Sequence, residues 1–320
     1  MNVKRFGRQR GVAVITALLL TTLAVTIVAS LFWQQQVQVR SMENQRLHLQ
    51  TKWILRGALD WAKLVLRQDG FDHGQYTALD QVWATPLAET RLDQYIERER
   101  VEGEVFDATL SGSIVDATSR YNLRNLAENR APVEAQVEIF RRLLRNLQLD
   151  PGLAAGVAKA VASAQPAPSG VEGPPAAQVV QGSAKPIALT QLDDLLAVPG
   201  FTLDMVNKLR QHAIVLPTNT AVNVNTASPE VIAALIPDFS VSEANALVAR
   251  RKQAAFRDLS YFTAVLGDRK PVEKSADVKS EYFLVLSRVR LDRAALDAEA
   301  LINRKLAPGN ETTLIWVRQN

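Results

Sequence analysis

The sequence contains no cysteine among its 320 residues. This excludes a disulfide framework, a cysteine-ligated zinc site and a thiol nucleophile. The chain has three histidines, and their positions show no metal-ligand spacing: His48, His73 and His212. It also lacks the serine-hydrolase elbow, the Walker-type loop, the His-Glu-x-x-His pair and the dinucleotide-binding fingerprint. The sequence therefore predicts a protein that is not an enzyme, with no metal site and no cofactor.

The excess of basic residues belongs entirely to the first ten positions. The chain has 37 Lys and Arg against 33 Asp and Glu. Four of the basic residues precede Gly11, and no acidic residue does: Lys4, Arg5, Arg8 and Arg10. Without these four the chain has 33 basic and 33 acidic residues, so it is formally neutral. We therefore expect no basic field that would attract nucleic acid.

An uncharged apolar segment, 12–33, follows this basic cluster. As a helix it would be about 33 Å long, which matches the hydrocarbon thickness of a bilayer. The basic residues before it predict a cytoplasmic N-terminus and an outward-facing remainder. Two alternatives remain for this segment: an uncleaved anchor, or a secretory signal with a weak cleavage site at 28–30.

The helical pattern continues beyond the membrane segment. Leu47, Ile54 and Trp61 recur at heptad spacing, and 34–68 contains no proline and one glycine, Gly57. These features predict one helix of about 55 residues. Half of it would lie in lipid and half would pack on a soluble domain.

Residues 10–20 read Arg-Gly-Val-Ala-Val-Ile-Thr-Ala-Leu-Leu-Leu. This segment resembles a type IV prepilin leader, which implies cleavage by a prepilin peptidase between Gly11 and Val12. Pilins and pseudopilins normally carry a glutamate at the fifth mature position, and here that position is Thr16. Among the pseudopilins of type II secretion, the missing glutamate is typical of the minor pseudopilin K family, which this sequence resembles.

The missing carboxylate has a physical meaning in that family. The glutamate is thought to neutralise the N-terminal ammonium of a neighbouring subunit, and an unpaired ammonium in an apolar filament core costs several kcal/mol. A subunit with Thr16 cannot offer this pairing to a subunit above it, so the resemblance implies a position at the filament tip. The alternative is that Thr16 is simply a tolerated membrane residue.

The rest of the chain predicts an α+β fold. A hairpin of 100–108 with 111–116 and later strands at 281–291 and 312–318 alternate with a long helical region. The resemblance implies that the late strands complete the early sheet. The expected architecture is a pilin-like long N-terminal helix packed on a small antiparallel sheet, with a large all-helical domain inserted and a single transmembrane helix.

The expected domain division follows from these elements. It comprises a cleaved leader (1–11), a transmembrane helix (12–33), the first part of a pilin-like domain (34–120), an inserted helical domain (121–280, with a flexible loop at 163–186) and closing strands (281–320). Two motifs in the insert are similar to those of the family, Tyr121-Asn122-Leu123 and Asn223-Val224-Asn225-Thr226-Ala227. The spacing of the first motif predicts that its asparagines cap helices and form turns, and the resemblance implies a packing role for the second motif.

A helix–turn–helix hairpin around Pro199-Gly200 supports a competing interpretation, because such hairpins also bind DNA phosphates. Acidic residues surround this turn: Asp193, Asp194 and Asp204. A membrane-tethered DNA-uptake protein is therefore the second hypothesis, and a signal-anchored periplasmic enzyme the third.

Calcium is not expected, although the family usually carries an acidic run in the insert. Between Asp150 and Asp193 this chain has only Glu172 as an acidic residue. Calcium needs six to eight oxygen ligands, so the sequence predicts no metal site here.

The resemblance also implies a biological setting. The chain would be a single-pass protein of the cell inner membrane, with its soluble domain in the periplasm. It would join minor pseudopilins I and J and the other pseudopilins, prime pseudopilus assembly, and cap the filament during export of folded proteins. Further expected partners are the prepilin peptidase, the inner-membrane secretion platform and membrane lipid, and nucleic acid is not among them.

Overall fold

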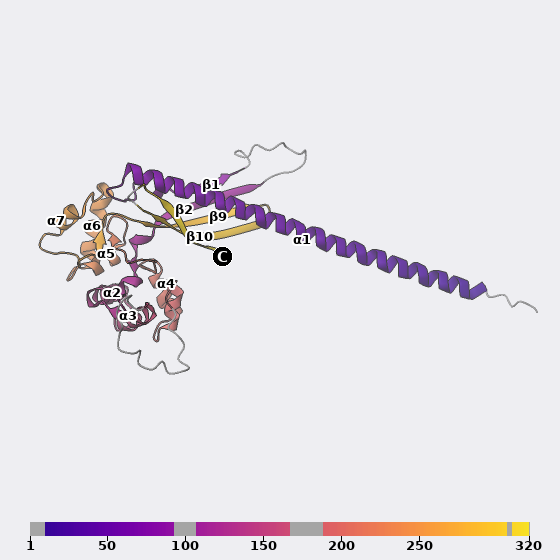
Figure 1. The fold of residues 1–320 in the computed structure, drawn as a ribbon, viewed down its shortest axis with the longest axis horizontal. Helices are drawn as coiled ribbons and strands as arrows, with labels where there is room; N and C mark the ends of the chain where they lie inside the picture. The colour runs from indigo at the N-terminus through magenta and orange to yellow at the C-terminus, as the bar shows by residue number, and fades with distance from the viewer. Residues whose placement is uncertain (1–9, 93–106, 167–187, 306–308, 320) are drawn as a thin grey trace, which may run out of the picture.

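The computed structural model of the chain describes residues 10–92, 107–166, 188–305 and 309–319. A single helix, α1 (Arg10–Asp72), extends far beyond a body that contains the sheet and the shorter helices (Figure 1). The helix has 63 residues, somewhat more than the sequence predicted. Its N-terminal part is apolar enough to cross a membrane, with a mean hydropathy of 2.5, and is not buried by the rest of the chain.

The C-terminal half of α1 packs on one face of the sheet. Leu55, Leu59, Ala62 and Leu66 recur at spacings of three and four residues, and each is at most 5% exposed. The heptad residues lie at the edge of this face: Ile54 is partly buried against the core, whereas Trp61 is 51% exposed. The heptad pattern therefore predicted the helix correctly.

A five-stranded antiparallel sheet forms the second layer. Its spatial order is β1 (Leu87–Arg91), β2 (Ala108–Asp116), β9 (Tyr282–Leu291), β10 (Ala294–Arg304) and β11 (Thr312–Gln319). Strands β9 and β11 confirm the two late strands predicted. The hairpin is different: 111–116 belongs to β2, but β2 pairs with β1 and β9, and 100–106 lies outside the described residues.

Strand β2 pairs with β9 along the whole length of β2, from Ala108 opposite Leu291 to Asp116 opposite Phe283. The late strands therefore complete the early sheet, as the resemblance implied. Between this sheet and α1 lies an apolar core in which the rings of Trp83 and Phe283 meet edge to face at 5.2 Å.

Between β2 and β9 the chain forms a second body. Its helices are α2 (Glu134–Asn146), α3 (Leu153–Ala164), α4 (Leu203–Leu209), α5 (Pro229–Leu235), α6 (Val241–Gln253) and α7 (Leu259–Leu266). Short 3-10 turns are η1 (Val82–Ala84), which precedes the sheet, and η2 (Ala117–Ser119), η3 (Leu123–Leu126) and η4 (Leu192–Ala197). This body has its own apolar core, separate from the one under α1.

The helical body differs from its prediction in three details. It is not all-helical, because it includes three two-residue strand pairs: β3 (Tyr121–Asn122) with β6 (Ala213–Ile214), β4 (Ala127–Glu128) with β5 (Ala131–Pro132), and β7 (Val222–Asn223) with β8 (Ala276–Asp277). The first arm of the Pro-Gly hairpin is the 3-10 turn η4 rather than an α-helix. Of the loop predicted at 163–186, residues 163–164 belong to α3 and 167–186 lie outside the described residues.

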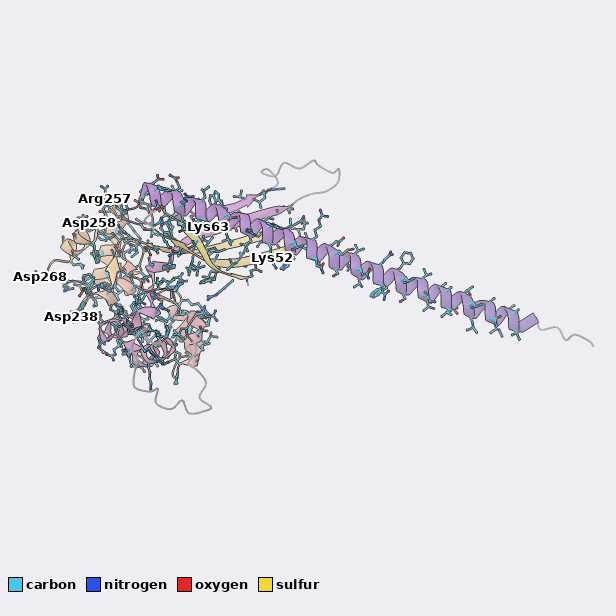
Figure 2. The ribbon with its side chains drawn as sticks, viewed as in Figure 1. Lys52, Lys63, Asp238, Arg257, Asp258 and Asp268 are labelled. Carbon is cyan, nitrogen blue, oxygen red and sulfur yellow. The ribbon has the colours of Figure 1, made fainter. Side chains whose placement is uncertain are left out.

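The two bodies lie at the same end of α1. In Figure 2, Lys52 and Lys63 mark the half of α1 that covers the sheet, whereas Asp238 and Asp268 lie at the far side of the helical body. The remainder of α1 projects away from both bodies as an isolated stem (Figure 1).

Candidate assembly site

The apolar stem of α1 keeps its polar groups satisfied within the helix. The hydroxyl of Thr16 donates to the carbonyl oxygens of Val12 and Ala13, both at 3.0 Å. Thr21 and Thr22 donate to the carbonyls three residues earlier, at 2.9 and 3.0 Å. These threonines therefore present little unmet hydrogen-bonding capacity to an apolar environment.

The residues predicted for processing and tip position share the first turns of this helix. The helix begins at Arg10, so Gly11 and Val12 lie in its first turn, and Thr16 lies one turn further on. Val12 is 60% exposed. A threonine hydroxyl carries no charge, so the position offers none to a neighbouring ammonium.

A second polar site, which we call the polar joint, lies where α1, the sheet and the helical body meet. It consists of Asp69, Thr77, Asp116, Asn223, Ser280 and Arg304. None of them exposes more than 4% of its surface. Buried polar groups are costly unless hydrogen-bonded, so their mutual contacts decide how well the bodies hold together.

Asp116 is the acceptor at the centre of the joint. One carboxylate oxygen accepts hydrogen bonds from the backbone and the hydroxyl of Thr118, at 2.8 and 2.7 Å. The other accepts from Asn223 Nδ2 at 2.9 Å and from the hydroxyls of Thr226 and Ser280, both at 2.6 Å. The carboxylate at the end of β2 thus binds the helical body and the start of β9 together.

Arg304 connects the same joint to α1. Its guanidinium donates to Asp69 Oδ2 at 2.6 Å, with both side chains at most 2% exposed. It also donates to the Thr77 hydroxyl at 2.9 Å and the Ser280 carbonyl at 3.1 Å, and lies 4.6 Å from the centre of the Phe283 ring. Burial lowers the pKa of Arg304, and the hydrogen bond to Asp69 opposes this shift.

The two asparagine motifs have structural roles, as the spacing of the first motif predicted and the resemblance implied for the second. Asn122 caps η3 by accepting from the Arg124 backbone at 3.1 Å. Asn225 accepts from the Phe256 backbone N–H and donates to the Phe256 carbonyl, both at 2.8 Å. The sequence did not reveal Asp69 or Arg304 as partners. Asp116 begins the short polar run 116–120 that leads into the first motif, which is the one local signal of its importance.

The other candidate residues do not converge on a chemical site. His48 is exposed, His73 contacts Asp69 at 3.0 Å, and His212 contacts the Ser228 hydroxyl at 2.9 Å. Within the described ranges, no group of three or more His, Asp or Glu side chains could hold a metal ion. At the Pro-Gly hairpin, Arg210 forms an ion pair with Asp193, so this arginine is already engaged by a carboxylate.

A long exposed apolar stem joined to an antiparallel sheet defines a membrane-anchored protein of the pilin-like class. Family models described as type II secretion system protein K match residues 119–218 and 222–278. The protein K of Pseudomonas aeruginosa is 30% identical over 88% of this chain and 85% of its own length. The chain belongs to the type II secretion system protein K family, whose members are minor pseudopilins.

Two further comparisons agree with this assignment. The protein K of Pectobacterium carotovorum is 26% identical, with 93% of each chain covered. The fold is similar to a chain in the crystal structure of the GspK-GspI-GspJ complex from the enterotoxigenic Escherichia coli type 2 secretion system. The TM-score is 0.67 and the identity 19%, over 87% of this chain and 99% of that chain. These comparisons do not favour a DNA-uptake function.

Proposed function

We propose that this minor pseudopilin forms the tip of the pseudopilus together with minor pseudopilins I and J and primes its assembly for export of folded proteins. The observation that supports this is Thr16, whose hydroxyl bonds to carbonyls of its own helix. A subunit above it would find no carboxylate for its N-terminal ammonium, and an unpaired charge in an apolar core is costly. The relative of similar fold is itself part of a complex with GspI and GspJ.

The domain organisation follows from this role. Residues 1–11 are the leader, 12–33 the membrane helix in the inner membrane, and 34–120 with 281–320 the periplasmic pilin-like domain. The helical body at 121–280 is the insert, and its bulk would obstruct stacking within a filament shaft but not at its end. The chain acts by assembly rather than by catalysis, with the prepilin peptidase, the secretion platform and inner-membrane lipid as its other partners.

Processing between Gly11 and Val12 is tested by intact mass and N-terminal sequencing of the protein purified from membranes. We expect a chain that begins at Val12 with a methylated amine. Gly11→Ala or Gly11→Asp should leave the full-length precursor in the membrane. The matched control is Gly57→Ala in the same helix, where an added Cβ meets nothing within 4 Å. Normal secretion with uncut precursor would contradict the proposal.

The tip position is tested by Thr16→Glu, with Thr16→Gln as an uncharged control of the same length. The glutamate can pair with the ammonium of an incoming subunit, so this variant should allow extension beyond the tip and lengthen the pseudopilus. The glutamine variant should behave as the parent does. Pseudopilus length by electron microscopy, together with secretion, gives the readout. Unchanged values in the glutamate variant would contradict the tip assignment.

A further inference from the structure

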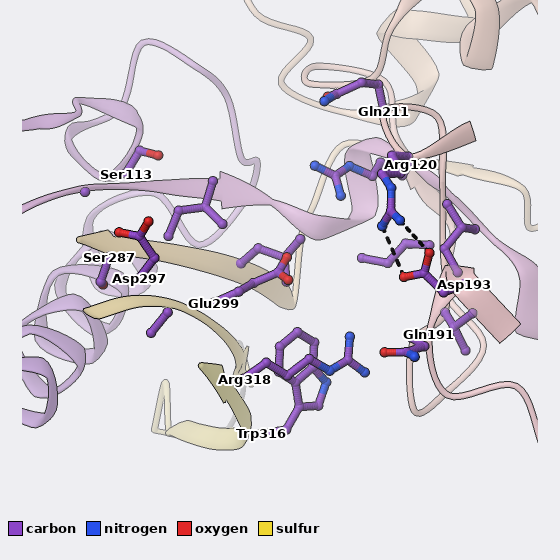
Figure 3. Close-up of a pocket in the computed structure, with 18 of the residues that line it drawn as sticks. Ser113, Arg120, Gln191, Asp193, Gln211, Ser287, Asp297, Glu299, Trp316 and Arg318 are labelled. Atoms are coloured by element: carbon purple, nitrogen blue, oxygen red, sulfur yellow. Dashed lines mark hydrogen bonds and ion pairs between the residues drawn. The ribbon is translucent and has the colours of Figure 1, made fainter. Parts of the chain in front are cut away.

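A groove of about 630 Å³ lies between the sheet and the helical body (Figure 3). One wall is the sheet face opposite α1, with Leu286, Glu299 and Trp316, and the other includes Gln191 and Asp193. The groove lies on the sheet face opposite the one that α1 covers. The assembly contacts proposed above do not use it.

Most charged side chains in the groove are already engaged. Arg210 pairs with Asp193, and Arg288 donates to Asp297 at 2.7 Å. Arg318 donates to the Thr190 carbonyl at 3.1 Å and stacks on the Trp316 ring at 4.1 Å. These contacts shape the walls. Among the described residues, Arg120, Arg318 and Glu299 are the charged side chains of the groove without an ion pair.

Arg120 is the unusual member of this set. Its guanidinium lies in the groove without a hydrogen bond or ion pair to any residue in the described part of the chain, and no interaction joins it to Glu299 in Figure 3. Burial lowers its pKa, and the nearby carboxylates of Glu299 and Asp116 oppose that shift. An arginine carries five N–H donors that match a carboxylate in bidentate geometry, so the groove contains a ready carboxylate receptor.

An apolar surface lies beside this receptor. Leu286, in the sheet wall, is 41% exposed. The Trp316 ring lines the same wall. A ligand that satisfies both features carries a carboxylate next to an aliphatic side chain, which is the chemistry of an extended acidic peptide segment.

We propose that this groove receives an extended segment of a neighbouring minor pseudopilin, with a Glu or Asp side chain on Arg120 and an aliphatic neighbour on Leu286. One ion pair and one apolar contact bind weakly in solution. Subunits held in the same membrane and joined by their stems have high effective concentrations, at which such a contact is occupied. The inference rests on the proposed assembly function and adds a second, specific contact outside the helix bundle.

The absence of cysteine allows a direct test on the full chain in detergent micelles, alone and in complex with minor pseudopilins I and J. Gln211→Cys places one thiol in an exposed position of the groove, and Gln253→Cys places one in an exposed position on α6 as the matched control. In the complex, N-ethylmaleimide should modify the groove cysteine about tenfold more slowly, as expected for a segment bound about nine-tenths of the time. The control cysteine should be unaffected.

Two variants made in the Gln211→Cys chain test the receptor itself. Arg120→Gln should abolish the protection, whereas Arg257→Gln, a change of an exposed arginine outside the groove, should retain it. Protection that survives Arg120→Gln would overturn the role of Arg120.

The remaining outcomes separate this inference from the assembly proposal. A complex that forms and co-purifies without protecting the groove cysteine would overturn the groove inference alone. Failure of the complex to form would instead contradict the proposed function. Protection by sodium glutamate alone, or by a purified exported protein alone, would overturn the assignment of the occupant to a neighbouring subunit.

Discussion

Replacing Asp69 by Asn should strongly destabilise the protein, although the substitution barely changes the size of the side chain. The change is nearly isosteric, but it removes the negative charge that lies 2.6 Å from a guanidinium that is fully buried. Breaking a buried ion pair from one side costs about 3–5 kcal/mol, because the remaining charge is left uncompensated. Arg304→Met should similarly leave Asp69 buried with one contact to His73. The double variant should be more stable than the sum of the two single losses predicts.

Urea unfolding of the full chain in detergent, followed by near-ultraviolet circular dichroism, measures these losses. The matched control is Asp60→Asn on the same helix, which removes an ion pair of equal length to Lys63. That pair lies at the surface, where solvent screens it, so its loss should cost much less. A cost for Asp69→Asn as small as that of the control would refute the reasoning, and so would additive losses in the double variant.

Three other substitutions have definite expected outcomes. Gly112→Ala would make a Cβ collide with the Leu286 carbonyl oxygen, so it should lower the unfolding free energy by about 1–3 kcal/mol. Gly57→Ala has open space and should raise it by up to about 1 kcal/mol, and a loss there would be unexpected. Hydrogen bonds from Ser240 lower the pKa of Glu243 from 4.5 to about 2. This contribution to stability is present above pH 4.5 and is lost as the pH falls to about 2. Glu243→Gln should therefore reduce the acid sensitivity of unfolding in that window, and an unchanged profile would contradict the assignment.

The long helix and the late strands were predictable because their signals are local. An uninterrupted apolar run and the absence of proline up to Gln68 are enough to specify α1. Strand β10 was not predicted, because Ala294–Ala300 is rich in alanine and contains glutamate and leucine, which favour helices. Its pairing with β9 and β11 overrides that preference.

The polar joint could not be predicted, since its partners are far apart in sequence. Arg304 and Asp69 are separated by 235 positions, and Asp116 and Ser280 by 164. No spacing rule connects residues at such distances. The groove around Arg120 was missed for the same reason, because its walls come from β2, the late strands and two segments of the helical body.

The joining of β2 to β9 also determines when the protein can fold. The first strands and the packing face of α1 emerge from the ribosome long before β9 and β10, which complete the sheet that α1 covers. Contacts between distant segments form slowly, because a long loop must close before any of them is made. The chain must therefore be synthesised almost completely before Asp69 meets Arg304. A ribosome that stalls shortly before that arginine would leave an unclosed precursor with an unpaired sheet edge, which proteases and chaperones recognise.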